Sequence, residues 1–245
     1  MIDELFEYGV YLALLVALAI PLSAYLNKVM AGQKTVLSRV LVPVENAVYR
    51  CIRVDKSEDM GWKRHIVSAF AFSANCLVGL FAILMLQGQL PRKPEGIPGM
   101  TRDHTFTTAV SCVTNPTRQA YSGESALSYF SQAIGLTVQN FVTPAVGLGV
   151  LFALFRGIVS EGNPGLGNFW VDVTRAVLFV LIPLSLVVTM IDVQQGSPQN
   201  FNEYETVQLL EPVGVTADGS IVDADDPAAV ETIDQATVPM GPQAS

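Results

Sequence analysis

The chain has 245 residues, of which half are hydrophobic and only 15% are charged, against about 25% in a typical soluble domain. The mean hydropathy is +0.40, and several windows of about 20 residues carry almost no charge, which is the length needed to cross a hydrocarbon core about 30 Å thick. This pattern excludes an ordinary soluble domain and predicts an integral membrane protein. The formal charge of −8 misleads as an average, because basic and acidic residues fall in different segments. The cysteines have no metal-site or disulfide spacing, so we expect packing residues at Cys51, Cys76 and Cys112.

Four apolar windows follow one another along the chain, and each is long enough for a spanning helix. They occupy residues 8–26, 66–87, 127–155 and 173–193. The first could be a secretory signal, but Asp3, Glu4 and Glu7 precede it where a signal has basic residues, so we expect a retained helix. The predicted segments are a first transmembrane helix at 1–27, a loop at 28–65, a helix–pore loop–helix repeat at 66–156, a loop at 157–172, a fourth transmembrane helix at 173–193 that starts a second repeat, and a tail at 194–245.

Lysine and arginine in the short loops predict the orientation in the membrane. The 28–65 loop holds 8 of the 14 basic residues and should face the cytoplasm, and Arg156 and Arg175 flank the next loop on the same side. The 194–245 tail has nine acidic residues and neither lysine nor arginine. Both termini are therefore expected outside the cytoplasm. The basic loop follows the positive-inside rule, and the alternatives for it are a contact with anionic lipid or with a protein partner.

The connection between the second and third windows has the pattern of a re-entrant pore loop. A polar loop with several prolines at 88–102 precedes an apolar run at 104–113, which is too short to span. An irregular polar stretch follows at 114–125. Irregular backbone is tolerated at membrane depth only where it is buried in protein or lines water. We therefore expect a short pore helix and a polar loop between two full spans.

The residues directly after the short apolar run are candidates for a cation site: Thr114, Asn115, Pro116 and Thr117. Potassium filters replace the hydration shell of the ion with backbone carbonyl oxygens. A helix that ends at this point directs its carbonyl end toward a cation. Pro116 should hold Asn115 in an extended conformation, which would set carbonyl groups in a row. From these residues alone, an ordinary extracellular turn is an equal alternative.

The third window carries one polar face along an otherwise apolar helix, made of Gln132, Gln139, Asn140, Thr143 and Gly147. In lipid, such residues turn toward the bundle interior or a wet cavity. Hydrogen bonds between helices and the lining of an ion path are the two interpretations of this face.

Several stretches of the sequence resemble one protein family. They are 61–63 (GWK), 119–124 (QAYSGE), 135–140 (GLTVQN), 167–172 (GNFWVD), 194–196 (QQG) and 239–242 (PMGP). On these motifs the chain resembles the N-terminal part of the potassium-transporting ATPase potassium-binding subunit. The resemblance implies an all-α integral membrane protein with four transmembrane helices and one re-entrant pore helix and filter loop. This would be part of a potassium-channel-like fold of four repeats, and the family's extra first helix matches the first window.

The resemblance also implies a function. The chain would bind extracellular potassium and pass it to a P-type ATPase catalytic subunit, in a Kdp complex with small accessory subunits in a bacterial or archaeal cell (inner) membrane. The implied potassium ligands, mainly backbone carbonyls, are Thr114, Asn115, Pro116, Thr117 and Gln119. The sequence has no GxxxxGKS/T motif and no DKTG-type motif, so we expect no catalytic site and no bound nucleotide in this chain. The lipid bilayer is an expected partner, and nucleic acid is not.

The family's usual pattern is Thr-Asn-Thr-Asn-Trp-Gln, whereas this chain has Thr-Asn-Pro-Thr-Arg-Gln at 114–119, and two of the departures matter for the site. Pro116 removes an N–H group that could brace the filter from behind. Arg118 brings a positive charge close to a cation site, where repulsion at about 4 Å would be roughly 4 kcal/mol at an effective dielectric constant of about 20. We therefore expect the Arg118 side chain to turn away, toward Glu124 or lipid headgroups.

Two other functions fit parts of the sequence. The chain is much shorter than the family and carries one of its four filter repeats, which would suit a truncated or degenerate, non-transporting membrane fragment. An intramembrane serine hydrolase would use Ser122 or Ser125 as nucleophile and His104 as base. That hypothesis lacks a partner to orient the base, so a potassium-binding subunit is the favoured hypothesis.

Overall fold

The computed structural model describes residues 2–91, 96–160, 165–196, 204–216, 220–223, 227 and 230–238. The chain forms two compact units, which are described separately. The first comprises Met1–Leu77, Cys112–Asn115 and Gln139–Ile191, and the second comprises Val78–Ser111, Pro116–Val138 and Asp192–Ser245.

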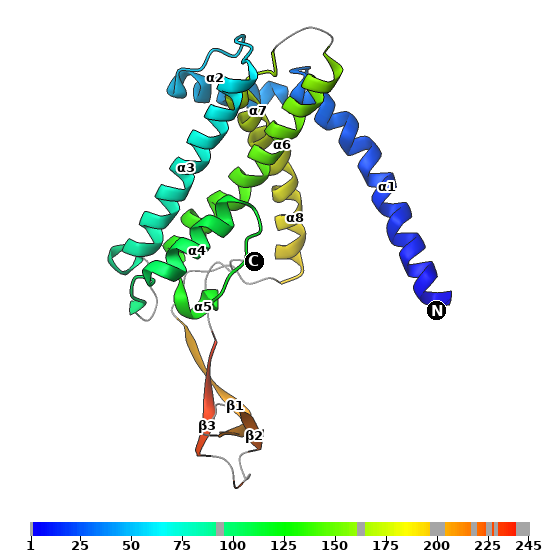
Figure 1. The fold of residues 1–245 in the computed structure, drawn as a ribbon. Coiled ribbons are helices and arrows are strands. Elements are labelled where there is room, and N and C mark those ends of the chain that lie inside the picture. Colours follow the sequence, from blue (N-terminus) through cyan, green and yellow to red (C-terminus); the bar gives the residue numbers. More distant parts are fainter. Residues whose placement is uncertain are drawn as a thin grey trace. The chain divides into compact units, whose positions relative to one another are not determined.

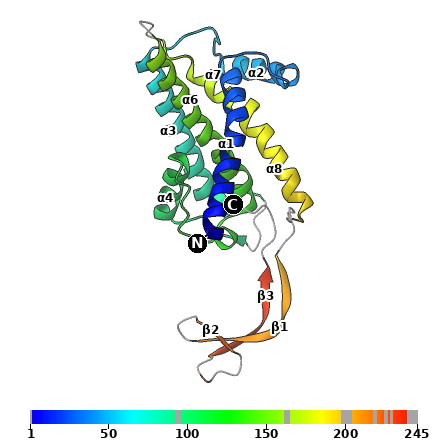
Figure 2. The same ribbon diagram turned by 90° about the vertical axis from the view of Figure 1, so that its right-hand side faces the viewer.

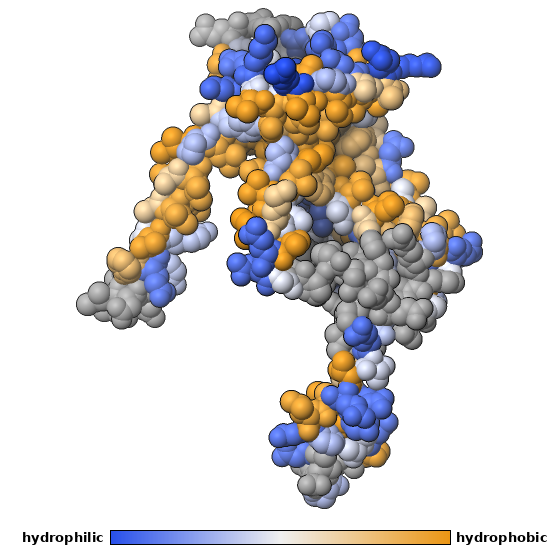
Figure 3. All heavy atoms as spheres, turned by 180° about the vertical axis from the view of Figure 1, so that it is seen from behind, coloured by the Kyte–Doolittle hydropathy of each residue, from blue (hydrophilic) through white to orange (hydrophobic). Residues whose placement is uncertain are grey.

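Four helices among the described residues are long and apolar enough to cross a membrane: Phe6–Met30, Trp62–Gln89, Ser131–Val159 and Phe169–Gln194. They confirm the four predicted spans. Large apolar side chains are exposed along all four, and apolar surface of this extent marks a lipid or protein contact. Figure 3 shows these apolar side chains along the helices, with hydrophilic side chains gathered at the top of the view. The chain is therefore a multi-span membrane protein.

The first unit is a helical assembly with two apolar clusters. It contains α1 (Ile2–Met30), α2 (Ser38–Ile52), the first part of α3 (Trp62–Leu86), most of α6 (Thr137–Val159), α7 (Phe169–Arg175) and most of α8 (Ile182–Gln194) (Figure 1). The C-terminal end of α1 joins the unit, where the Tyr25 hydroxyl donates to the Phe179 carbonyl oxygen (2.7 Å). Val29 and Met30 pack there against Phe179. The second cluster lies around Phe169, which is fully buried with Met60, Ala145, Val173 and Ala176.

Helix α2 lies in the segment that we expected to be a basic loop. Figures 1 and 2 both show it beside α7, at the end of the unit at which α3 and α7 begin. It ends at Arg53, whose φ of 55° is left-handed and whose N–H donates to the Tyr49 carbonyl oxygen, as at many helix C-termini. Its buried residues are the polar Glu45 and Tyr49, which hydropathy alone would place on the exposed side of a helix.

The third and fourth spans each contain one π-helical turn, η3 (Ser131–Leu136) and η4 (Ala176–Leu181). Such turns widen the helix by one residue and leave a carbonyl group without its usual partner. At the end of η3, the Gln132 carbonyl oxygen accepts from both the N–H and the hydroxyl of Thr137 (3.0 Å for the hydroxyl). Gly135 gives α3 room in the second unit, since a Cβ atom there would lie 3.2 Å from Leu80.

The second unit contains the rest of α3, η1 (Gln87–Gln89), most of α4 (Arg102–Val113), the loop from residue 116 onward and α5 (Gly123–Ala126). Leu80, Leu84, Ala109 and Leu127 are almost fully buried in it. Helix α4 confirms that the short apolar run at 104–113 is helical. Its re-entrant position in the membrane, and the four-repeat fold, stay predictions.

The expectation of an all-α chain is wrong for the tail. There β1 (Glu205–Val215), β2 (Ile221–Asp223) and β3 (Glu231–Val238) form an antiparallel sheet in the order β2-β1-β3, with an irregularity between Gln208 and Val213. Short runs of valine, isoleucine and threonine favour strands, although acidic residues flank them. The motif at 239–242 lies outside the described residues.

Candidate cation-filter loop

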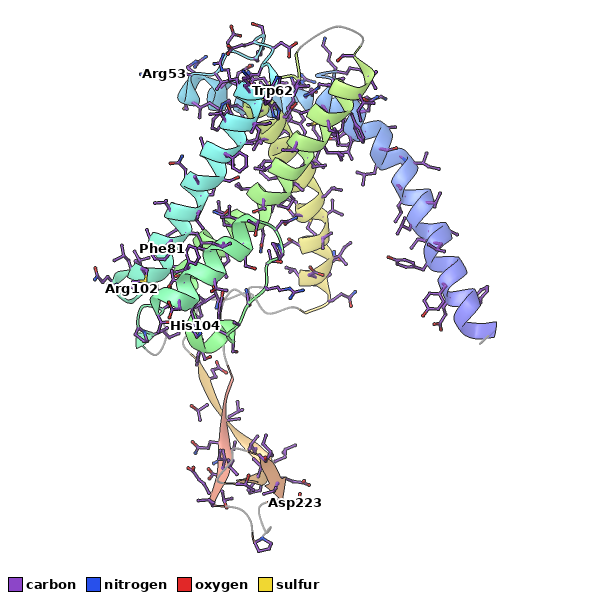
Figure 4. All side chains as sticks on the ribbon, viewed as in Figure 1. Arg53, Trp62, Phe81, Arg102, His104 and Asp223 are labelled. Atoms are coloured by element: carbon purple, nitrogen blue, oxygen red, sulfur yellow. The ribbon has the colours of Figure 1, made fainter. Side chains whose placement is uncertain are left out.

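Helix α4 leads directly into the candidate site. One face of the helix is buried, with Thr105 and Ala109 fully inaccessible and Thr108 nearly so, whereas Phe106 is exposed. Arg102 and His104 lie at the start of α4 (Figure 4). The helix ends at Val113, immediately before the four candidate residues. The negative end of its dipole therefore lies next to them.

The backbone of the loop alternates in hand. Asn115 has a φ of 76° and Thr117 a φ of 48°, and both values are left-handed, whereas Thr114 and Pro116 have no positive φ. The expectation that Pro116 holds Asn115 extended is therefore wrong. A helix commonly terminates with a left-handed residue, and asparagine accepts that conformation better than other residues with a side chain.

In a trans peptide group the N–H and the C=O point in opposite directions, so the bonds of an N–H group also fix the side to which the preceding carbonyl oxygen points. Two N–H groups of the loop point back to the last turn of α4. The N–H of Thr117 donates to the Ser111 carbonyl oxygen (3.3 Å), and that of Arg118 donates to Ser111 Oγ (2.7 Å). Ser111 thus braces the loop from the N–H side, a role that the sequence did not indicate.

The loop side chains are exposed from Thr114 to Gln119, so this part of the chain does not cover them. In the first unit, Thr114 and Val113 line a largely apolar cavity of about 820 Å³ with residues of α3 and α6. Arg118 is exposed, as are its neighbours in the loop, and the expectation that its side chain turns away stays a prediction. Its predicted pairing with Glu124 is untested, because the Glu124 side chain lies outside the described residues.

Gln87, at the end of the second span, bonds the segment before α4 and the segment after the candidate loop, all within the second unit. Its side chain is fully buried. Nε2 donates to the carbonyl oxygens of Pro98 (2.9 Å) and Ala126 (2.8 Å), and Oε1 accepts from the N–H of Ser128 (3.2 Å). A buried amide with three bonds satisfies backbone groups on either side of α4 and the candidate loop. The sequence shows an amide at the end of an apolar window, but a glutamine at an ordinary helix terminus looks the same, so the role of Gln87 could not be predicted.

Residues 9–245 match the protein family described as KdpA, potassium-transporting ATPase A subunit. The chain belongs to the KdpA family. Three relatives are each called potassium-transporting ATPase potassium-binding subunit. Those of Clostridium botulinum, Desulfovibrio desulfuricans and Geobacter metallireducens are 50%, 50% and 44% identical over 100%, 96% and 99% of this chain. The matches cover 40%, 38% and 41% of the relatives, so the chain spans about two fifths of their length.

The polar face on the third span of this KdpA chain divides into two groups. Gln132 and Thr143 bond backbone groups: Gln132 Nε2 donates to the Gly123 carbonyl oxygen (2.9 Å) in the second unit, and Thr143 Oγ1 contacts the Cys112 carbonyl oxygen (3.0 Å) in the first. Gln139 is buried, whereas Asn140 and Gly147 are exposed. Hydrogen bonds between helices are therefore present, since Gly123 belongs to α5 and Cys112 to α4, and the lining of an ion path stays a prediction.

The serine hydrolase alternative gains nothing from the geometry. Ser125 Oγ donates to the Ser122 carbonyl oxygen (3.3 Å) and not to a base. His104 is exposed in the first turn of α4, and the described part of the chain shows no hydrogen bond between it and Ser125. A nucleophile needs a base within hydrogen-bond distance.

At the other end of the first unit, Arg156 of α6 and Asp172 of α7 form a two-bond ion pair. Arg156 Nη1 lies 2.6 Å from Asp172 Oδ2, and Nη2 lies 2.8 Å from Oδ1. The Asp172 side chain is 1% exposed. Arg156 also donates to the Leu166 carbonyl oxygen (3.0 Å). Gly167 has a φ of 84°, and a Cβ atom there would collide with the Arg156 guanidinium.

The same region connects α7 to the preceding loop and to α2. Asn168 caps α7 by accepting from the Trp170 N–H (3.1 Å), and its amide donates to the Asp55 carbonyl oxygen (3.1 Å). Arg175 Nε donates to Glu45 Oε1 (2.9 Å), which also accepts from the Tyr49 hydroxyl (2.7 Å). Burial, and next the hydrogen bond to the Glu45 carboxylate, raises the pKa of the Tyr49 hydroxyl, so Tyr49 remains a donor. The 167–172 motif is therefore an anchoring element.

Proposed function

We propose that this chain contributes a potassium site to the ion-selecting membrane subunit of an ATP-driven potassium uptake pump. The site is formed mainly by the carbonyl oxygens of Thr114, Asn115, Pro116 and Thr117, with Gln119 beside them. The observation that carries the proposal is the alternating hand of residues 114–117, with N–H groups held back by Ser111. Family membership, and the names of the relatives as potassium-binding subunits, agree with it.

The chemistry of potassium fits such a segment. An ion that leaves water loses a hydration shell worth on the order of tens of kcal/mol, which carbonyl dipoles must replace. The bonds from the N–H groups of Thr117 and Arg118 to Ser111 leave the carbonyl oxygens of Pro116 and Thr117, which belong to the same two peptide groups, on the opposite side. The C-terminal end of α4 adds a negative dipole end at the same place. A cation is therefore favoured there, and an anion is not.

The rest of the assembly follows from the family. Three further helix–pore loop–helix repeats, from residues that the relatives have beyond the matched part, would complete a ring around the ion. A P-type ATPase subunit would hydrolyse ATP and receive the ion, together with small accessory subunits. The basic segment at 28–65 would face the cytoplasm, and both ends of this chain would lie outside it, in a bacterial or archaeal cell membrane.

Charge beside the loop should matter more than side-chain size. In a full-length family member that carries these residues, Gln119→Arg should weaken potassium-dependent uptake strongly, because it adds a second fixed charge beside Arg118. Thr117→Ala should be mild, since carbonyls carry the binding. Arg118→Trp should keep or improve the apparent affinity for potassium. The improvement should not exceed the roughly 4 kcal/mol of repulsion between two like charges about 4 Å apart.

The measurement is uptake of potassium, rubidium and sodium by cells that express each variant with its ATPase partner. If all three substitutions leave affinity and selectivity unchanged, the loop is an ordinary extracellular turn. The non-transporting alternative predicts that the unsubstituted protein also fails to support uptake.

Orientation can be tested by cysteine labelling in intact cells. In a Cys51→Ser background, Asp223→Cys in the tail should react with a membrane-impermeant maleimide, and Lys56→Cys should react only after the cells are opened. The reason is the concentration of basic residues at 28–65 and of acidic residues in the tail. Labelling of Lys56→Cys from outside would overturn the proposed orientation.

A further inference from the structure

The two residues of helix α2 that are buried are polar, whereas several of its apolar residues are exposed. Glu45 and Tyr49 are buried and bonded to each other, and Glu45 also accepts from Arg175 of α7. The opposite side exposes valines: Val40 is 70% and Val44 is 44% exposed. A helix of a soluble protein normally has the reverse arrangement. The outward face therefore needs an apolar surrounding that the described residues do not supply.

The outward face has two adjoining stripes, as the helical period of 3.6 residues defines them. The apolar stripe runs at positions i, i+4, i+7 and i+11 and consists of Val40, Val44, Ala47 and Cys51. The second stripe consists of the residues that directly precede these four in the sequence, and it carries Arg39 at one end and Arg50 at the other. All six of these side chains are exposed. An apolar stripe beside a cationic stripe is the pattern of a helix lying in a membrane interface.

The position of α2 in the first unit agrees with this pattern. It lies beside α7, at the level where α3 and α7 begin (Figures 1 and 2). At that level Trp62, the first residue of α3, is 59% exposed, and the Lys63 ammonium lies 5.5 Å from the centre of its ring. Exposed tryptophan beside lysine marks the headgroup region of a bilayer. Arg53 lies at the same end of the unit, where α2 ends (Figure 4).

We propose that α2 is an interfacial anchor whose outward face binds anionic phospholipid. The apolar stripe enters the boundary of the acyl chains, and Arg39, Arg50 and Arg53 pair with headgroup phosphates. Charge complementarity selects anionic lipid, because the exposed charges on this face are all positive. The Glu45–Arg175 ion pair fixes the rotation of the helix, so that the stripes face the lipid. This inference is independent of the proposed potassium site.

The first test measures the depth of α2 with Cys51, which is exposed, whereas Cys76 is half-buried and Cys112 is buried. The chain is labelled briefly with an NBD maleimide and reconstituted into phosphatidylcholine vesicles that contain phosphatidylglycerol. The label at Cys51 should be quenched by doxyl lipids and protected from iodide. A label at Lys56→Cys in a Cys51→Ser background should show the opposite. Equal iodide quenching at both positions would overturn the proposal.

The second test measures lipid selectivity in neutral detergent, by titrating the Cys51-labelled chain with brominated phosphatidylglycerol or phosphatidylcholine. Arg39→Gln/Arg50→Gln should raise the apparent Kd for phosphatidylglycerol about tenfold or more. Lys34→Gln/Lys56→Gln removes the same charge from the same segment outside the stripe and should change it little. Equal affinity for the two lipids would overturn the proposal. So would protection of Cys51 from both quenchers only when the ATPase subunit is added, because the face would then be a protein interface.

Discussion

Asp172→Asn should lower the free energy of unfolding of this chain by about 3–5 kcal/mol, the range measured when one partner of a buried ion pair is removed. Asp172 is 1% exposed and accepts two bonds from Arg156. The substitution keeps the shape of the side chain but removes the negative charge to which the guanidinium is bonded. Arg156 also bonds the Leu166 carbonyl oxygen, so the loop before α7 should loosen with it.

The measurement is denaturant or thermal unfolding in nanodiscs, with Glu58→Gln as the matched control. Glu58 pairs with Arg64, but the two side chains are 38% and 61% exposed. Exposed pairs contribute about 0–1 kcal/mol, so the same carboxylate-to-amide change should have little effect there. Equal destabilisation by the two substitutions would show that the Arg156–Asp172 pair is no anchor.

Asn115→Val should abolish, or weaken about tenfold or more, the potassium dependence of uptake in a full-length family member, whereas Asn115→Gly should preserve most of it. The φ of 76° at Asn115 is left-handed. A β-branched residue there costs on the order of 1–3 kcal/mol of strain, and the loop would relax by turning a carbonyl group out of line. Glycine adopts the same φ freely.

The two substitutions are compared by the potassium concentration that gives half-maximal uptake, at matched expression. The pair separates backbone geometry from loss of the asparagine amide, because both variants lack that amide. Equal impairment would instead assign the role to the Asn115 side chain, against a site built from carbonyl groups.

The sequence predicts the spans and α4 well, because uncharged windows of sufficient length leave few alternatives in a membrane. It fails where a structure depends on distant residues. The sequence does not show that Glu45 is buried, because its partner Arg175 lies far along the chain. Likewise, Gln87 acquires its role only when Ala126 and Pro98 are brought to it.

The candidate loop shows the same division. Its residue types and its position after a short helix are evident in the sequence, but its backbone is not. The general effect of Pro116 predicts an extended Asn115, whereas the helix terminus and the tolerance of asparagine produce a left-handed residue. In the tail, the acidic residues make the strand pattern of the β-branched runs hard to recognise in the sequence. The strands are evident only in the structure, where β1 pairs with β3.

Thallium soaking of crystals of a full-length family member carrying these residues tests the central claim most directly, because thallium replaces potassium and can be located by anomalous scattering. The proposal predicts an anomalous peak in direct contact with the carbonyl oxygens of residues 114–117, on the side away from Ser111. Excess potassium should remove that peak. Thallium peaks elsewhere in the subunit, with none at these carbonyl groups, would contradict the proposal.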